Sequence, residues 1–205
     1  MTSINTINLD KGQRISLDKA APGLKKIVVG LGWRESGVPG VAFDLDASAL
    51  MLNAQNRVGQ DHHFIFYNAA FQVSPCGSVR HSGDNLSGAQ NEEECEQIAI
   101  NLETLPESVK RIVIAVTIYK ATERGQNFGQ VRDAFAQIKN EETGETVARY
   151  NLTHTYDKET ALEMLEIYRY SDGNVNEWRV GAIGQGYSQG LNGIASRYGL
   201  DVTGG

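Results

Sequence analysis

The sequence predicts an all-β protein, a β-sandwich of two sheets with a few short helices, one of them near the C-terminus. Short runs of strand-forming residues follow one another along the chain, separated by Gly, Asn, Asp or Pro, which is the pattern of a β-sandwich. Too few helical segments alternate with these runs to build a parallel α/β sheet. Both observations favour a fold in which side chains from two sheets share one core.

The expected strands are rich in Val, Ile, Phe and Tyr, and several alternate apolar with polar residues. The run at 110–120, KRIVIAVTIYK, is apolar on both faces, which predicts a strand in the middle of its sheet. We expect strands at 25–32, 41–46, 63–68, 96–102, 110–120, 134–139, 147–152, 164–170 and 177–184.

Two short helical segments are expected. LPESVKR at 105–111 can form one turn with Pro106 at its first position. At 188–198 the apolar residues fall at helical spacing, and Gly199 can end the helix. We find no internal repeat and no low-complexity linker, so residues 1–205 are expected to form a single domain.

Composition limits the function of the chain. Its 205 residues carry a net charge of −6, which argues against nucleic acid because phosphate contacts depend on Lys and Arg. The N-terminus does not resemble a signal peptide, and no apolar run approaches the roughly 18 residues of a membrane span. We therefore expect a cytoplasmic protein without a membrane span, in which Cys76 and Cys95 are two independent reduced thiols.

The first acidic cluster is FDLDAS at 43–48. On an extended strand Asp44 and Asp46 point to the same face. Neighbouring carboxylates raise each other's pKa unless a cation lies between them, and calcium takes six to eight oxygen ligands. The alternative is a pair of solvated acids on an exposed strand face.

The second acidic cluster consists of GDNLSG at 83–88 and NEEECE at 91–96. Its glycines allow a tight turn, and Asp84, Asn85, Glu94 and Glu96 could direct oxygens toward one point. The alternative is a solvated acidic loop. Neither cluster is an EF-hand, because Ala and not Gly stands at the sixth position of each loop, and the last position holds no Glu. Any calcium site must combine separate loops.

Enzyme motifs are weak in this sequence. GYSQG at 186–190 matches GxSxG, but all four histidines precede Ser188, which is the wrong order for the hydrolase triad. His62 and His63 are adjacent on an expected strand and would face opposite ways. GLG at 30–32 continues to Glu35 where a dinucleotide-binding motif needs Gly. We identify no catalytic residues. A calcium-assisted hydrolase using paired carboxylates, and a scaffold whose ion only stabilises loops, remain alternatives.

The order of short motifs is more specific than any one of them. The chain contains, in order, VGLGW (29–33), FDLDAS (43–48), HFIFYN (63–68), SGDNLSG (82–88), an acidic patch, NLETLPESVKRIVIAVTIY (101–119), FGQVRDAF (128–135), EIYRY (166–170) and EWRVGAIGQG (177–186). From about residue 5 to residue 199 it resembles the TerD family of bacterial tellurite-resistance and general stress proteins.

This resemblance implies a calcium-binding β-sandwich without enzymatic activity, acting through protein–protein interaction. It implies sister tellurite-resistance proteins and a TerC-type membrane protein as partners. Carried over position by position, it implies calcium ligands at Asp44, Asp46, Asn68, Asp84, Asn85, Glu94 and Glu96, with Asp61 as a weaker candidate.

The chain departs from the family pattern in two places. Arg34 follows Trp33, where family members commonly have Asp. The stretch after GDN is GAQNEEECE, which lacks glycines of the family pattern and has Cys95 in place of an acid. Because Glu and Asp differ in reach and a thiol is a poor calcium ligand, we expect one ion, or two with weaker affinity.

Overall fold

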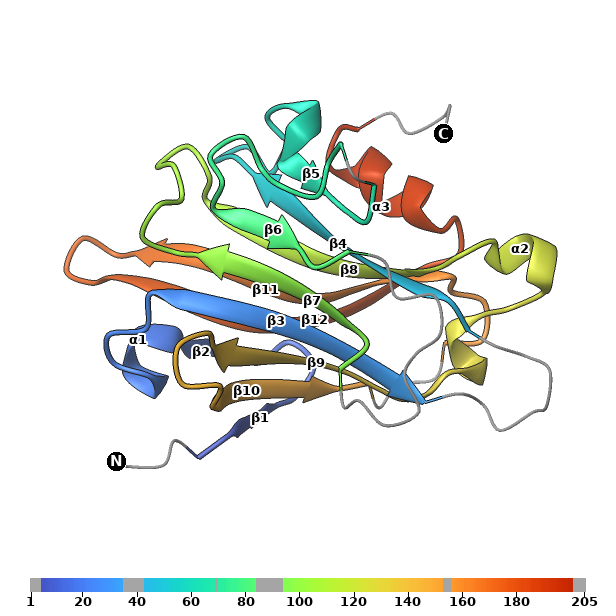
Figure 1. Ribbon diagram of the computed structural model, residues 1–205, viewed down its shortest axis with the longest axis horizontal. Coiled ribbons are helices and arrows are strands. Elements are labelled where there is room, and N and C mark those ends of the chain that lie inside the picture. The colour runs from blue at the N-terminus through green and yellow to red at the C-terminus, as the bar shows by residue number, and fades with distance from the viewer. Residues whose placement is uncertain (1–4, 35–42, 69, 84–93, 153–155, 201–205) are drawn as a thin grey trace.

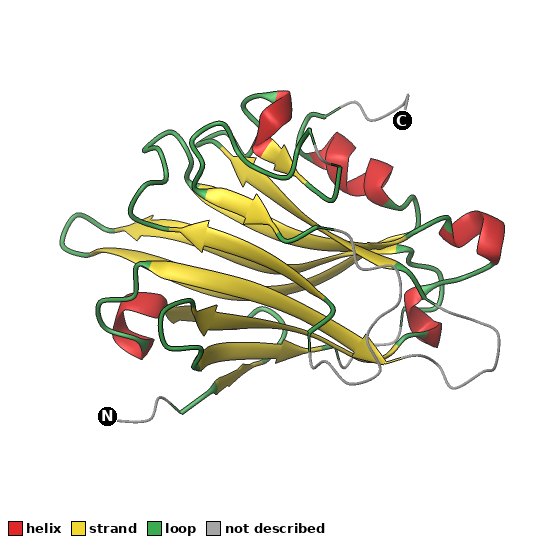
Figure 2. Ribbon diagram, in the orientation of Figure 1, coloured by secondary structure: helices red, strands yellow, loops and turns green. Residues whose placement is uncertain are grey.

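The computed structural model describes residues 5–34, 43–68, 70–83, 94–152 and 156–200 (Figure 1). In this part of the chain, the strands form two six-stranded sheets. Sheet A has the order β1-β10-β9-β3-β7-β6, and sheet B has the order β2-β12-β11-β8-β4-β5. The predicted two-sheet sandwich with short helices is confirmed, and Figure 2 shows how far strands outnumber helices.

The strands of sheet A are β1 (Ile7–Leu9), β3 (Lys26–Arg34), β6 (Val79–His81), β7 (Glu96–Asn101), β9 (Arg132–Asn140) and β10 (Thr146–Asn151). Those of sheet B are β2 (Arg14–Ser16), β4 (Leu45–Leu52), β5 (Phe64–Ile65), β8 (Arg111–Ile118), β11 (Ala161–Ser171) and β12 (Asn176–Tyr187). The helices are α1 (Leu17–Ala20), α2 (Ala121–Arg124) and α3 (Leu191–Arg197), with 3₁₀ turns η1 (Asp61–His63) and η2 (Phe128–Gln130).

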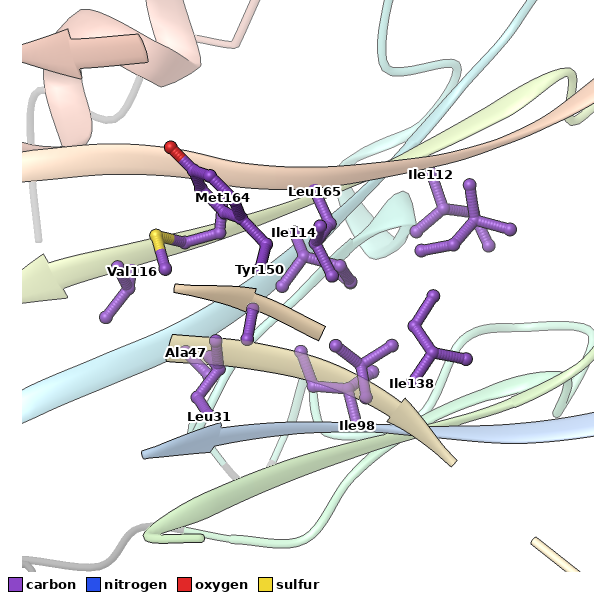
Figure 3. Packing of buried hydrophobic residues seen from close by; sticks show 14 of the residues in the cluster. Leu31, Ala47, Ile98, Ile112, Ile114, Val116, Ile138, Tyr150, Met164 and Leu165 are labelled. Atoms are coloured by element: carbon purple, nitrogen blue, oxygen red, sulfur yellow. The ribbon is translucent and has the colours of Figure 1, made fainter. Parts of the chain in front are cut away.

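The main core lies between the two sheets. Apolar side chains from β3, β7 and β9 of sheet A meet those from β4, β8 and β11 of sheet B, as Figure 3 shows for Leu31, Ile98 and Ile138 facing Ile112 and Leu165. β8 pairs with β11 on one side and β4 on the other, which confirms its predicted central place. Burial of this interface is the dominant stabilising term.

A second apolar cluster covers part of the outer face of sheet B. Ile194 and Tyr198 pack with Leu50, Val113 and neighbouring residues of the sheet. The helix predicted at 188–198 is confirmed as α3, and Gly199 follows it with a φ of 82°. This left-handed conformation suits glycine at the end of a helix. The outer face of sheet B is therefore buried where α3 covers it, and the buried residues there come from β4, β5, β8 and the start of β11.

Some predicted boundaries were wrong. The strand expected at 41–46 begins only at Leu45 and continues to Leu52, because β8 and β5 pair with the later residues. Of the expected strand at 63–68, only Phe64–Ile65 pairs, and both histidines before it lie in η1. The segment 105–110 is not helical: Val109 donates to the Pro106 carbonyl at 2.9 Å and the chain then enters β8.

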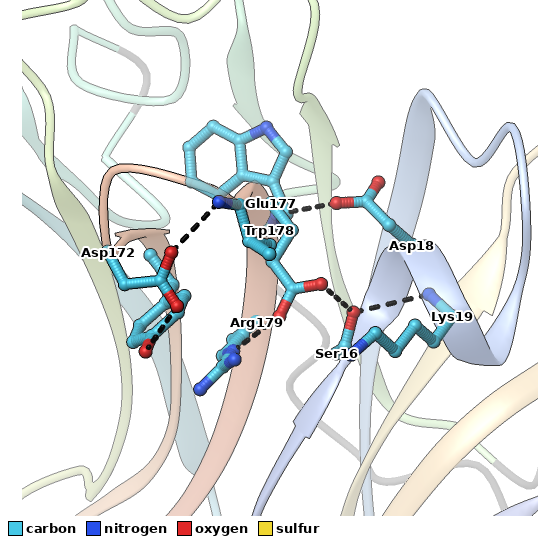
Figure 4. A network of polar contacts seen from close by, with 9 residues as sticks. Ser16, Asp18, Lys19, Asp172, Glu177, Trp178 and Arg179 are labelled. Atoms are coloured by element: carbon cyan, nitrogen blue, oxygen red, sulfur yellow. Dashed lines mark hydrogen bonds and ion pairs between the residues drawn. The ribbon is translucent and has the colours of Figure 1, made fainter.

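A polar network attaches α1 to β12 at one end of sheet B (Figure 4). Asp18 accepts a hydrogen bond from the Trp178 backbone N–H at 2.8 Å, and Ser16 donates to Glu177 at 2.6 Å. Glu177 also accepts from Arg179 at 2.7 Å. The hydrogen bonds from Ser16 and Arg179 lower the pKa of the Glu177 carboxyl. These contacts hold the N-terminal segment on the edge of the sheet and lie apart from the acidic clusters.

Candidate functional site

Asp44 and Asp46 lie where β4 begins, and both side chains are half-buried. The Asp44 carbonyl accepts a hydrogen bond from the Tyr119 N–H at 2.8 Å, and Asp46 pairs with Thr117 of β8. Leu45 and Ala47 belong to the core between the sheets, so the alternation turns Asp46 toward the outer face of sheet B. β8 thus fixes the position of this first acidic cluster.

The second acidic cluster reaches β4 through the side chain of Glu96. This carboxylate is 1% exposed, and its Oε2 accepts a very short hydrogen bond from the backbone N–H of Ala47. His81, at the end of β6, contacts the Ala47 carbonyl through Nε2 at 3.2 Å. At Ala47 the edge of β4 has no strand partner among the described residues, because β5 pairs only with Ala49 and Leu50. Two side chains of sheet A therefore satisfy the backbone of sheet B.

The hydrogen bonds of His81 define its tautomer. The Gly83 N–H donates to Nδ1 at 3.0 Å, so Nδ1 carries no proton. Nε2 then carries the proton and donates it to the Ala47 carbonyl, and Glu96 Oε2 lies 3.6 Å from the same nitrogen. His81 was not among the predicted site residues. In the sequence, His81 stands two positions after the apolar Val79, which predicts only that both side chains point to the same, inward face of a strand.

Glu94 lies on the other side of sheet A from Glu96. Its carboxylate contacts Gly30 on the outer face of the sheet, where a side chain at that glycine would collide with it. It accepts hydrogen bonds from Gln137 at 2.6 Å and Gln97 at 2.8 Å, and lies 2.9 Å from Lys139 Nζ. The structure therefore does not bring Glu94 together with Glu96.

The remaining predicted ligands are dispersed or lie outside the described residues. Asn68 Oδ1 accepts from the Ala70 N–H at 3.1 Å, and its carbonyl accepts from Phe71 N–H at 2.8 Å, so this residue caps a turn. Asp61 begins η1, and its side chain is not described. Asp84 and Asn85 lie outside the described residues. Within the described ranges, no three His, Cys, Asp or Glu side chains gather where they could hold a metal.

One observation nevertheless favours a cation near this junction. Glu96 Oε1 is buried and has no hydrogen-bond partner among the described residues. A buried carboxylate oxygen without compensation is costly, and a cation is one means of compensating it. In the sequence, the segment 84–93 shortly precedes Glu96 and contains three further acids, Asp84, Glu92 and Glu93. The donors present are hard oxygens of the kind calcium prefers.

The features of a serine hydrolase are incomplete. The predicted strand-turn-helix context of GYSQG exists, since β12 ends at Tyr187 and α3 begins at Leu191. No hydrogen bond joins the Ser188 hydroxyl to a histidine or a carboxylate in the described part of the chain. His154 lies outside that part.

The cysteines differ in environment. Cys76 is exposed, Cys95 is buried, and the two form no disulfide with each other. Burial raises the pKa of the Cys76 thiol, but hydrogen bonds from Ser74 and Ser78 together outweigh it, so the net shift of this pKa is downward. Ser74 Oγ lies 3.3 Å from the sulfur. Cys76 is thus the more reactive thiol.

The fold and these sites define a two-sheet β-sandwich protein with two acidic segments that meet at one strand of sheet B. The TerD domain family matches residues 5–198. The chain is 46% identical to General stress protein 16U of Bacillus subtilis (strain 168), covering 96% of this chain and 99% of that protein. It is 41% identical to Tellurium resistance protein TerD of Serratia marcescens, covering 97% and 100%. The chain belongs to the TerD family, which includes proteins named for tellurium resistance and for the general stress response.

A solved structure supports the fold. A homologue of telluride resistance protein (TerD) from Streptomyces coelicolor A3(2) superposes with a TM-score of 0.63 at 20% identity, covering 80% of this chain and 91% of that one. Among the described residues, none of the helices has the length and apolar character needed to cross a membrane.

Proposed function

We propose that this protein is a calcium-binding, non-enzymatic component of a bacterial tellurium-resistance or general stress system, acting in the cytoplasm through protein–protein contacts. Its family membership supports the biological setting. The related TerZ and TerX proteins of Serratia marcescens carry the same kind of name, and such sister proteins, with a TerC-type membrane protein, are the partners we propose.

The buried, unpartnered Oε1 of Glu96 is the observation that carries the calcium proposal. Asp44 and Asp46 would hold the ion together with Asp84 and Asn85, and Glu96 would hold the base of the 84–93 segment against β4. A bound calcium ion would supply positive charge that offsets repulsion among these carboxylates. Glu94 is engaged by Lys139 and stands apart from this set.

The test is a calorimetric titration of the chelator-stripped protein with calcium, and with magnesium for comparison. We expect saturable calcium binding, with a stoichiometry that counts one ion or two. Asp46→Asn and Glu96→Gln should each weaken binding about tenfold or more, because each removes a charge from the ion's surroundings. Asp10→Asn, at an exposed acid near the N-terminus, is the matched control and should leave affinity unchanged.

Two outcomes would overturn the calcium proposal. One is the lack of a binding isotherm at millimolar calcium in a protein whose circular dichroism is that of a folded β-sandwich. The other is unchanged affinity in both Asp46→Asn and Glu96→Gln. A thermal melt of each variant without calcium separates a loss of binding from a loss of folding.

A further inference from the structure

A pocket on the outer face of sheet B is not explained by calcium binding. It has a volume of about 210 Å³ and lies between β4, β8, the segment after β5 and the start of α3. Asp46, Ser48 and Thr117 line it on the sheet side, and Phe66 and Leu191 line it from above the sheet. A single water molecule needs only about 10–15 Å³ of cavity volume in the same measure, so this pocket has room for a small organic molecule.

Ser48 is the residue that points to a ligand in this pocket. Its side chain is 3% exposed, and its hydroxyl has no hydrogen-bond partner among the described residues. Polar groups buried this deeply are nearly always hydrogen-bonded, so an unpartnered hydroxyl facing a cavity indicates that a molecule in the cavity supplies the partner. Alternation along β4 places Ser48 on the same face as Asp46 and Leu50.

The pocket presents charges of both signs. Asp46 lies on its floor, and Lys120 lies at its rim after β8. Lys120 Nζ is 3.9 Å from Glu123 Oε2, and both side chains are at least half exposed, so this ion pair is weak and the ammonium can turn toward a ligand. A purely anionic ligand would meet the carboxylate, and a purely cationic ligand would meet the ammonium. A zwitterion satisfies both.

The rest of the lining is aromatic and aliphatic. Phe66 stacks with Phe64 at 4.8 Å and with Phe71 at 5.4 Å, so this wall is held in place by its own ring cluster. Tyr119 and Leu191 add apolar surface on other sides. An aliphatic side chain fits such walls, because its burial removes apolar surface from water.

We infer that this pocket binds a small zwitterion of the α-amino-acid type, with its ammonium group toward Asp46, its carboxylate toward Lys120 and the Ser48 hydroxyl bonded to one of the two. Ser48 and Lys120 are not among the proposed calcium ligands. Asp46 is shared with the proposed calcium site, so the ligand is titrated into chelator-treated protein, and the Ser48 and Lys120 variants test this pocket without altering a proposed calcium ligand.

The experiment is a calorimetric titration of the chelator-treated protein with L-leucine, its methyl ester and its N-acetyl derivative. The ester retains only the positive charge, and the N-acetyl derivative retains only the negative charge. We expect saturable binding of L-leucine at one site, and binding at least tenfold weaker for each derivative. Ser48→Ala and Lys120→Met should each weaken L-leucine binding about tenfold, the effect of losing a hydrogen bond to a charged group.

Ser78→Ala is the matched control for Ser48→Ala. Ser78 is likewise 3% exposed, but it lies beside sheet A and bonds Thr104 at 2.8 Å. Its substitution should leave L-leucine affinity unchanged. If Ser48→Ala fails to fold, the exposed Lys120→Met variant still tests the proposal. The inference is overturned if L-leucine does not bind at millimolar concentration, if either derivative binds as tightly, or if folded Ser48→Ala and Lys120→Met retain full affinity.

Discussion

Removing the Tyr187 hydroxyl tests how α3 is held on sheet B. Tyr187, at the end of β12, donates a hydrogen bond to Glu163 Oε1 at 2.8 Å and accepts one from Arg197 of α3 at 2.6 Å. Glu163 is 1% exposed, so the hydroxyl is a main partner of a buried carboxylate. Tyr187→Phe keeps the ring and removes only these two hydrogen bonds.

The expected loss follows from the charge on the acceptor. A hydrogen bond to a charged group contributes about 1.5–3 kcal/mol. Arg197 Nη1 lies 3.8 Å from Glu163 Oε2 and its side chain is about half exposed, so it can approach the carboxylate and recover part of this. We therefore expect Tyr187→Phe to lower the free energy of unfolding by about 2 kcal/mol. For a chain of this length, that lowers the melting temperature by about 4–8 °C.

Urea denaturation followed by circular dichroism measures this loss. The midpoint should fall with an unchanged m-value, because the surface exposed on unfolding is the same. Tyr119→Phe is the control, since the Tyr119 hydroxyl donates to no described residue and that side chain is 37% exposed. A double-mutant cycle that combines Tyr187→Phe with Glu163→Gln measures the interaction energy between the Tyr187 hydroxyl and the Glu163 carboxylate. A loss below about 0.5 kcal/mol, or strict additivity in the cycle, would refute the reasoning.

Three further predictions concern other parts of the chain. Gly184→Ala should destabilise the fold by about 2–4 kcal/mol in urea, because Gly184 has a φ of 61° and an added Cβ would collide with the Tyr150 hydroxyl. Ser74→Ala should raise the pKa of the Cys76 thiol and slow its alkylation by iodoacetamide below that pKa, because a hydrogen bond to sulfur is lost. Burial and the Glu163 hydrogen bond raise the pKa of Tyr187 from 10.0 to about 12. Above pH 10 the unfolded chain loses a proton that the folded chain keeps, so stability should fall between pH 10 and pH 12, less steeply in Tyr187→Phe.

Each of these predictions has its own control. Gly144 also has a positive φ but open space around it, so Gly144→Ala should cost only the backbone strain, and equal losses at the two glycines would contradict the collision. Cys76→Ala should abolish the fast alkylation, and persistence of that reaction would assign it to Cys95. Parallel stability curves of wild type and Tyr187→Phe from pH 10 to pH 12 would show that Tyr187 is not the titrating group.

Family and fold class could be predicted from the sequence because they depend on local residue patterns and on the order of motifs, and neither requires knowing which segments pack together in space. The apolar run that became β8 indicates a strand wherever it lies, and the ordered motifs extend over nearly the whole chain. α3 was likewise predictable, since helical spacing and a following Gly199 are local signals. β1, β2 and β6, of three residues each, were missed, because strands this short form only when a partner is in place.

The candidate site was decided by tertiary structure. Asp44 and Asp46 could be named because a strand's alternation is local, but the meeting of Glu96 and His81 at Ala47 depends on an edge of β4 that β5 leaves unpaired. Residues 94 and 96 would share a face on one strand, yet Glu94 precedes β7 and lies over Gly30 on the opposite side of the sheet. Ser48 carries no signal in sequence at all. Which group meets a carboxylate or a hydroxyl depends on strands distant in the chain, so the sequence names the acids and only the packed sheets determine their partners.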